Sequence, residues 1–450
     1  MTHSDQHGLA LSTTDSEAVA AFDDTVNAYL RFGRDTGPKL KAALKADPDM
    51  VMANCLLGYF MMLMGAPALL PRAAKALANA DACYSSATPR ERMHIEALRV
   101  WIAGDLLACL ELWEAILIEH PRDLLAIKLA HFIHFYLGDS ENLRDSIARV
   151  LPAWHETSPN YGFLLAMRAF GLEETGNYSA AENYGRKAVD LNPDDTWGVH
   201  AVAHVLEMQD RHQEGLEWLD QLESNWRACN NFRYHVAWHR ALFLVDLACY
   251  DEVLARYDQE IWDPDSDEYL DLCNDASLLV RLEIAGVDVG DRWQSLFEKV
   301  KHRTDEHLLA FIDVHFAMIL AAAGGSNAAE RLLSAIRDYH PGPQNTTGDI
   351  LAHQGLPLCE ALVAYRTGDY EQAVDLLYPI RYQIRRIGGS HAQRDIFAQV
   401  LLDAAIKAGR FSLARALLAE RTALKPNNPW SLRRYSEVLQ QLNDERVVAE

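Results

Sequence analysis

The amino-acid sequence of 450 residues predicts an all-α protein built from repeated helical pairs. Prolines that end helices recur 38 and 34 residues apart, at Pro121, Pro159 and Pro193. Turn residues recur in step with them, at intervals of 34, 38 and 34 residues, at Gly104, Gly138, Gly176 and Asp210. No segment alternates between apolar and polar residues over the length of a strand. The pattern therefore indicates a helix, a tight turn and a second helix, repeated along the chain.

A period near 34 residues is that of the tetratricopeptide repeat. The segments GDYEQAVDLL from Gly368 and GNYSAAENYGRKAVDLNP from Gly176 are close to the pattern of its second helix. One such pair cannot bury its own apolar face, so neighbouring pairs must stack. We predict a right-handed tetratricopeptide-like α-solenoid of about eleven helical pairs from Ser16 to Ala423, followed by a closing helix from Trp430 to Leu442.

The predicted organisation is a flexible N-terminus over residues 1–15 and one solenoid domain over residues 16–450. Two places break the period, namely the polar connection Asp263–Asp265 and the Gly- and Pro-rich segment 338–357. Long ordered loops in compact folds often act as lids or binding loops. The segment 338–357 is therefore a candidate lid, with a tolerated insertion as the alternative.

The composition argues against two classes of partner. Lys and Arg together number 42 and Asp and Glu number 64, so the formal net charge is −22. Such a surface repels phosphate backbones and anionic membranes, and we expect neither as a partner. The uncharged stretch Met50–Leu70 is long enough to span a bilayer. It contains Asn54 and Pro67 and coincides with one repeat, so we interpret it as a buried helix.

Seven scattered cysteines, none in a CxxC pair, predict reduced thiols and a cytoplasmic location. The first residues show no basic region followed by an apolar core, so no export signal is expected. The chain also lacks a GxSxG elbow, a Gly-rich phosphate loop and a GxGxxG motif after a strand. Neither nucleotide nor flavin chemistry is predicted, and the cofactor is left unknown.

The most informative stretch is HAVAHVLE, in which His200, His204 and Glu207 stand at i, i+4 and i+7. A helix places all three on one face, and the repeat register assigns that face to the concave wall. Other side chains assigned to the wall or adjacent to it are Phe170, His235, Trp238, His239 and Glu283. A wall that combines aromatic, histidine and acidic groups is typical of a small-molecule pocket.

Each of these histidines could have a purely structural role instead of a functional one. A lone histidine in a helix is usually a packed structural residue, and we favour that interpretation for His94, His131 and His134. Three polar groups on one concave face are costly unless they are paired or used, which favours function for the HAVAHVLE set. Histidines at i and i+4 with a carboxylate can bind zinc or iron. The spacing is not HExxH, so we assign no metal and favour a His–Glu network acting as a general base.

Two further segments carry candidate site residues. FIDVHFAM contains Asp313 and His315, which are expected to point to different sides of a helix. GGSHAQRD contains His391, Arg394 and Asp395 at a predicted helix start. Exposed N–H groups there can hold an anion or a carboxylate.

Several segments together resemble the tetratricopeptide repeat protein 38-like family, which includes the StaR-like proteins of glycopeptide antibiotic clusters. They are HAVAHVLEMQDRHQEGLEWL, HVAWHRALFLVD, DASLLVRLEIAGVDVGDRW, GLPLCEALVAYRTGDYEQAVDLL and GGSHAQRDIF. The resemblance covers nearly the whole chain and implies a tetratricopeptide-like solenoid. Because its most specific blocks carry the histidines, it also implies a shared pocket, although it names no reaction.

The functional prediction is a histidine-rich concave pocket that binds a small molecule, or an enzyme that uses His/Glu acid–base chemistry. In the enzyme reading, Glu207 orients a histidine base and Arg394 holds an anionic group. The catalytic candidates are His200, His204, Glu207, His235, His239, His391 and Asp395, and the ligand-binding candidates are Trp238, Arg394, His315, Asp313 and Phe170. The alternative is a protein-interaction scaffold without catalytic activity. Either a small molecule or a protein is the expected partner, and a homo-oligomer is compatible with both.

Overall fold

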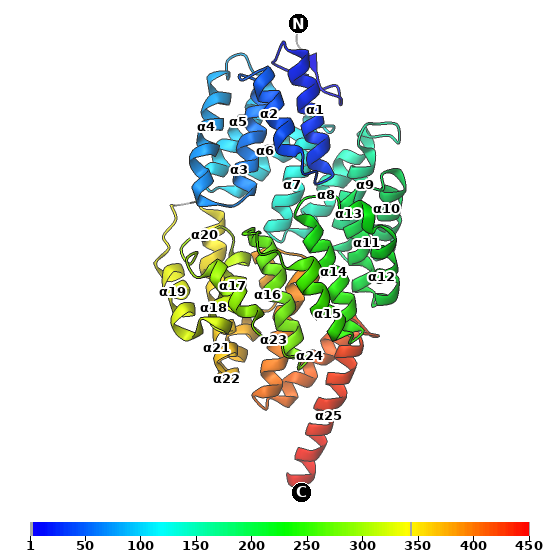
Figure 1. The fold of residues 1–450 in the computed structure, drawn as a ribbon, viewed down its shortest axis with the longest axis vertical. Helices are drawn as coiled ribbons and strands as arrows, with labels where there is room; N and C mark the ends of the chain where they lie inside the picture. Colours follow the sequence, from blue (N-terminus) through cyan, green and yellow to red (C-terminus); the bar gives the residue numbers. More distant parts are fainter. Residues whose placement is uncertain (1–2, 343, 450) are drawn as a thin grey trace. The chain divides into compact units, whose positions relative to one another are not determined.

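The computed structural model describes residues 3–342 and 344–449, which form an all-α, tetratricopeptide-like array (Figure 1). This confirms the predicted fold class. The β-structure in the described residues is one short antiparallel pairing of β1 (His3–Ser4) with β2 (Ala10–Leu11). The chain divides into two compact units. Unit 1 comprises Met1–Val202, Leu222–Arg233 and His340–Asp349, and unit 2 comprises Ala203–Gln221, Tyr234–Tyr339 and Ile350–Glu450.

Unit 1 is a series of consecutive helices that pack against their neighbours in sequence. The helices are α1 (Ser16–Leu30), α2 (Thr36–Ala46), α3 (Val51–Leu63), α4 (Leu70–Ala82), α5 (Pro89–Ile102), α6 (Leu106–Glu119), α7 (Leu124–Tyr136), α8 (Ser140–Val150), α9 (Tyr161–Glu173) and α10 (Tyr178–Leu191). Short 3₁₀ turns are η1 (Pro67–Leu69) and η2 (Leu151–Ala153), and α13 (Glu223–Trp226) is a single turn. The long helix α11 (Thr196–Met208) begins in unit 1 and ends in unit 2.

Unit 2 continues the same pattern with longer connections. Its helices are α12 (His212–Gln221), α14 (Phe232–Asp246), α15 (Tyr250–Arg256), α16 (Tyr269–Ile284), α17 (Arg292–Val300), α18 (Ala310–Ala323), α19 (Gly325–Asp338), α21 (Leu356–Thr367), α22 (Tyr370–Ile380), α23 (His391–Lys407), α24 (Phe411–Leu424) and α25 (Pro429–Ala449). The π-helical turn η3 (Tyr257–Ile261) follows α15, and the 3₁₀ turn η5 (Ile384–Ile387) precedes α23.

The turns predicted from glycine and aspartate form as expected. Gly104 and Gly138 have φ angles of +91° and +65°, which a residue without a Cβ adopts at little cost. The aspartate after each glycine caps the next helix, as when the Asp105 carboxylate accepts a hydrogen bond from the Ala108 amide at 2.9 Å. Asp139 caps α8 in the same way. Each Gly–Asp pair therefore ends one helix and starts the next.

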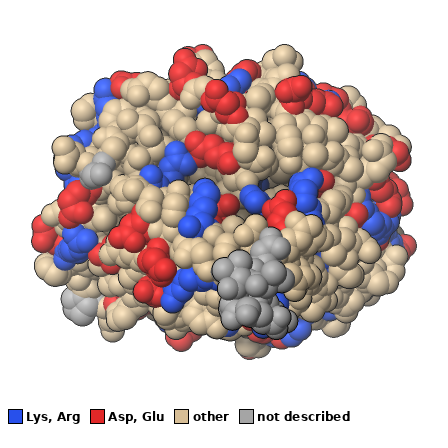
Figure 2. Space-filling model, turned by 90° about the horizontal axis from the view of Figure 1, so that it is seen from below, with Lys and Arg blue, Asp and Glu red and all other residues tan. Residues whose placement is uncertain are grey.

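The stretch Met50–Leu70 forms the buried helix α3, followed by a turn. Its interior position explains why it lacks charge, as predicted. Among the helices of residues 3–342 and 344–449, none combines the length and the apolar character needed to cross a bilayer. Figure 2 shows acidic and basic side chains interspersed over the face that it presents, without a continuous basic track.

The segment 338–357 is more structured than an inserted loop. It contains the short helix α20 (Thr346–Ile350) and the π-helical turn η4 (Leu351–Gly355). Within unit 1, the Thr346 amide donates to the Gly104 carbonyl at 3.1 Å, and the Leu106 amide donates to the Thr346 hydroxyl at 3.1 Å. Thr346 therefore joins this segment to the turn between α5 and α6.

Residues of the N-terminal segment, which the sequence predicts to be flexible, make contacts within unit 1. The Ser12 amide donates to Glu91 Oε1 at 3.0 Å, and the Thr13 hydroxyl donates to Asp47 Oδ2 at 2.5 Å. Leu11 is fully buried. The N-terminal residues thus contact the end of α2 and the first turn of α5.

A buried polar network stabilises the interior of unit 1. Asp123, the N-cap of α7, accepts a hydrogen bond from the Ala126 amide at 3.0 Å. Its Oδ2 lies 2.6 Å from Arg90 Nη1 and 3.0 Å from His94 Nε2. Burial alone would raise the pKa of Asp123, but the Arg90 guanidinium and His94 outweigh it and hold that pKa well below its usual value. The buried charges of Arg90 and Asp123 are therefore paired with each other inside unit 1.

We expect Asp123→Ala to destabilise the protein by about 3–5 kcal/mol, because Arg90 would remain buried without its carboxylate. The pKa of Asp123 is depressed in the folded chain, so its stabilisation is present above the unfolded-chain pKa of about 3.9 and is lost as the pH falls below it. Urea unfolding at pH 7 measures the loss. Asp145→Ala, which removes an exposed partner of Arg144, is the control and should leave the midpoint nearly unchanged. Equal midpoints for Asp123→Ala and wild type would contradict the expectation.

Candidate functional site

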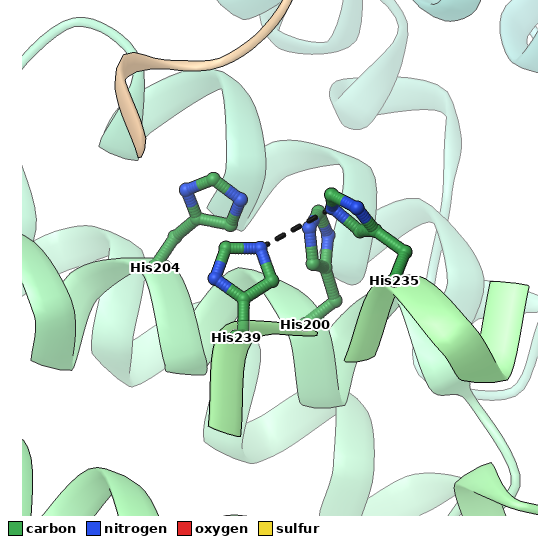
Figure 3. Close-up of side chains that lie close together, drawn as sticks. All are labelled: His200, His204, His235 and His239. Atoms are coloured by element: carbon green, nitrogen blue, oxygen red, sulfur yellow. Dashed lines mark hydrogen bonds between the residues drawn. The ribbon is translucent and has the colours of Figure 1, made fainter. Parts of the chain in front are cut away.

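Three histidines of unit 2 lie together where α11 faces α14 (Figure 3). His204 comes from α11, and His235 and His239 stand one turn apart on α14; we call these three the histidine centre. The rings of His204 and His239 lie 4.4 Å apart between centroids, and His235 Nε2 lies 3.2 Å from His239 Nε2. One nitrogen of each ring lies within 4.8 Å of the others. His200, which Figure 3 also draws, stands one turn before His204 on α11.

Two histidines of the centre are oriented through their Nδ1 atoms. His239 Nδ1 lies 3.0 Å from Glu207 Oε2, and His235 Nδ1 lies 3.1 Å from Asn274 Oδ1. The amide oxygen of Asn274 can only accept, so Nδ1 of His235 carries the proton and donates it. A neutral His235 therefore presents a lone pair at Nε2, the atom that faces His239.

Burial sets the charge states of these groups. Desolvation lowers the pKa of His204 and His239 well below the ordinary histidine value, and it lowers the pKa of His235 to about 4 against the opposing hydrogen bond to Asn274. Desolvation also raises the pKa of Glu207. At neutral pH the imidazoles are neutral, which is the form that accepts a proton or binds a metal. His235 is the partly exposed member of the centre.

A buried arginine lies beside the histidine centre. The Trp238 ring stacks on His235 at 5.3 Å between centroids and has Arg281 Cζ at 5.4 Å from its own centroid. Trp238 Nε1 donates to the Ser277 hydroxyl at 3.1 Å. The Arg281 guanidinium donates to the backbone carbonyls of Ser277 and Ala392 at 3.0 and 2.7 Å. Trp238 therefore contacts both the imidazole of His235 and the guanidinium of Arg281.

Among the described residues, no carboxylate lies within 4 Å of the Arg281 guanidinium, although Arg281 is only 4% exposed. Desolvation accordingly lowers the pKa of Arg281, although Asp395 and Glu207 oppose the shift. Both of those carboxylates contact other groups, since Asp395 accepts two hydrogen bonds from Arg421 at 2.6 and 3.0 Å and Glu207 contacts His239. The positive charge of Arg281 is thus poorly compensated within unit 2.

The sequence predictions did not identify Arg281 or Asn274. Asn274, Ser277 and Arg281 stand at i, i+3 and i+7 on α16, the same kind of pattern that marks HAVAHVLE. From this helix we had selected Glu283, which instead accepts a hydrogen bond from Trp293 Nε1 at 2.9 Å and forms an ion pair with Arg366. The helical spacing of Asn274, Ser277 and Arg281 is the sequence pattern from which these residues could have been predicted as part of the site.

The start of α23 contributes the residues predicted from GGSHAQRD. Ser390 caps the helix and forms a capping box with Gln393, so the predicted cap is present and one helix-start amide is already bonded. His391 and Arg394 lie close enough to His204 that their charges help burial to lower its pKa. Burial would raise the pKa of Asp395, but Arg421 outweighs it and holds that pKa low. Asp395 thus balances Arg421, and Arg394 donates to the Gly389 carbonyl.

The remaining predicted residues lie in other surroundings. Phe170, on α9 of unit 1, is fully buried and stacks on His200 at 5.5 Å between centroids. On α18 of unit 2, Asp313 Oδ1 contacts His307 Nδ1 at 2.8 Å. His315 donates through Nδ1 to the Phe311 carbonyl at 2.7 Å. Asp313 and His315 therefore have different partners.

No protein-family model matches the chain. Among solved structures, the human IFIT1 dimer with m7Gppp-AAAA is 14% identical, with 95% of this chain and 90% of that chain covered and a TM-score of 0.37. Yeast Tom70 is also 14% identical, with coverages of 96% and 90% and a TM-score of 0.37. The P58(IPK) TPR domain is 11% identical, with coverages of 80% and 99% and a TM-score of 0.23. The assignment of the fold rests on the helices themselves, and these superpositions transfer no activity.

We expect His315 to make stability depend on pH in the mildly acidic range. Desolvation lowers its pKa to about 4 in the folded chain, with a smaller effect of Arg281 in the same direction and an opposing effect of the Phe311 carbonyl. The unfolded chain, with a histidine pKa of about 6.5, binds the proton first as the pH falls. The stabilisation is therefore complete above pH 6.5 and declines towards pH 4, by about 2–3 kcal/mol.

The measurement is urea unfolding of wild type and His315→Gln at pH 7.5 and pH 5. Glutamine keeps a hydrogen-bond donor for the Phe311 carbonyl but does not titrate, so the variant should lose less stability between the two pH values. At pH 7.5 both side chains are neutral. The difference in stability between the two proteins at that pH therefore reports the change in packing alone. An identical pH dependence for the two proteins would show that His315 is not responsible.

Proposed function

We propose that unit 2 binds a small anionic molecule, such as a carboxylate or a phosphate, at the histidine centre and Arg281. The observation that carries this proposal is the buried Arg281 guanidinium without a carboxylate partner. A buried charge costs several kcal/mol unless it is paired, and a bound anion would supply the missing charge. The nearby carboxylates of Asp395 and Glu207 already contact other groups. We therefore expect the negative charge that balances Arg281 to come from a bound molecule.

The surroundings of Arg281 suit a small ligand better than an extended peptide. Trp238 and His235 form a flat stacked pair, and neutral imidazoles can donate or accept single hydrogen bonds. A few polar groups among apolar side chains are typical of small-molecule sites. Trp238 and Arg394 remain ligand-contacting candidates in this proposal.

A second candidate function is proton transfer to or from the bound molecule. It is favoured by the 3.0 Å contact between Glu207 Oε2 and His239 Nδ1, because a carboxylate that orients an imidazole makes it a better base. His204 and His391 are further members of this acid–base set, and His200, in unit 1, stays a sequence prediction.

The finer family assignment, to the tetratricopeptide repeat protein 38-like family, belongs to the same proposal. HAVAHVLE and GGSHAQRD, which carry the resemblance, contribute His204, Glu207 and His391 to unit 2. A cytoplasmic location is part of the proposal as well. The competing hypothesis is a scaffold that binds a protein partner through the helical array and uses these residues only for packing.

Isothermal titration with acetate, succinate, inorganic phosphate and phenyl phosphate tests the anion site. We expect saturable binding of at least one probe, weakened about 10- to 100-fold by Arg281→Met, because a hydrogen bond to a charged group contributes about 1.5–3 kcal/mol. Arg281→Lys keeps the positive charge but lacks the planar guanidinium, so its affinity for the probe should lie between those of wild type and Arg281→Met. Circular dichroism verifies that each variant is folded.

Arg337→Met is the matched control, because its guanidinium pairs with Glu330 and Glu360 at a half-exposed position on α19. It should bind the probe as wild type does. The anion proposal fails if none of the four probes binds, which leaves the scaffold hypothesis. It also fails if Arg281→Met binds as tightly as wild type.

A further inference from the structure

The closest contact within the histidine centre joins two ring nitrogens, which need either a proton or a metal cation between them. His235 Nε2 and His239 Nε2 lie 3.2 Å apart. Because Nδ1 of His235 donates to Asn274, Nε2 of a neutral His235 carries a lone pair that points at His239. Two lone pairs at this distance repel each other, so a proton or a metal cation must lie between them.

A single proton between the two Nε2 atoms satisfies that contact but leaves the contact between His239 and Glu207 without a proton. If Nε2 of His239 carried the proton, Nδ1 of a neutral His239 would be a bare acceptor 3.0 Å from Glu207 Oε2. That second contact would then need its own proton, on Glu207. A metal cation is the other species that fits these contacts, because both Nε2 atoms can coordinate it while Nδ1 of His239 donates to Glu207. Carboxylate and carbonyl acceptors behind metal-binding histidines are a recurrent arrangement.

The distances also suit an ion. Zinc–nitrogen bonds of 2.0–2.1 Å in a tetrahedron place ligand nitrogens about 3.3–3.4 Å apart, close to the 3.2 Å between His235 and His239. A nitrogen of His204 lies within 4.8 Å of a ring nitrogen of each of these two histidines. Neutral imidazoles favour zinc, cobalt and nickel over magnesium or calcium, which prefer oxygen ligands.

We propose that His204, His235 and His239 bind one divalent transition-metal ion of the zinc type, with Glu207 and Asn274 as positioning residues. Three protein ligands leave one tetrahedral position open, as in catalytic rather than structural zinc sites. A water molecule or the proposed anion can occupy that position. The metal site does not depend on the anion proposal, since it rests on the histidines, Glu207 and Asn274 and not on Arg281. It does exclude His239 Nε2 as a general base while the ion is bound.

Cobalt titration of protein purified without a polyhistidine tag and dialysed against EDTA tests the site. We expect visible d–d absorption of four-coordinate Co²⁺ that saturates at one ion per chain and disappears on addition of Zn²⁺. Mass spectrometry of the zinc-loaded, desalted protein should return one zinc per chain. His239→Ala should abolish the absorption, and His155→Ala, an exposed histidine outside unit 2, should retain it.

Asn274→Leu keeps all three ligands and provides a readout if His239→Ala does not fold. Loss of a group that orients a ligand weakens metal affinity about 10- to 100-fold, so its cobalt curve should shift by that factor. Less than one ion per chain, or an unchanged cobalt curve for both folded variants, would overturn the proposal. Binding of the four anion probes to EDTA-treated protein is measured separately. Anion binding without metal binding would refute the metal site alone, and the converse would refute the anion site alone.

Discussion

The structure depends on one constraint, namely that a two-helix repeat cannot bury its own apolar face. Each pair is stable only when neighbours cover it, and the helices in the middle of the stack are covered on most sides. In α7 and α16, nearly every residue is buried. Any polar side chain on such a helix is desolvated and must find a partner inside the protein or supply a function.

The two units meet this requirement differently. In unit 1, Asp123 bonds to Arg90, His94 and a helix-start amide, so its charge is compensated by groups of the same unit. In unit 2, the imidazoles of His235 and His239 face each other through nitrogens. Among the described residues, the Arg281 guanidinium donates to two backbone carbonyls and to no carboxylate. A balanced network is explained by stability, whereas an unbalanced one indicates a species supplied from outside. This contrast is the reason for locating the function in unit 2.

Local sequence patterns were sufficient for the helices and for part of the site. Gly–Asp turns such as Gly104–Asp105 and the HAVAHVLE stretch act over a few residues, and helical periodicity alone places His204 and Glu207 on one face. The contacts of His239 with Glu207 and of His235 with Asn274 join residues 32 and 39 positions apart. These depend on how α11, α14 and α16 pack, which no local pattern specifies. Arg281 was missed for that reason, although its spacing from Asn274 was visible.

The sequence by itself determined an all-α array of tetratricopeptide type, its turns, the buried character of α3 and a histidine-bearing face on α11. Only the tertiary structure decided that His204, His235 and His239 lie together, that Asp395 compensates Arg421, and that no carboxylate of the described residues pairs with Arg281. The physical reason is that helix formation and capping are set by neighbours in sequence, whereas desolvation and charge compensation are set by neighbours in space. The candidate site is defined by the second kind of neighbour.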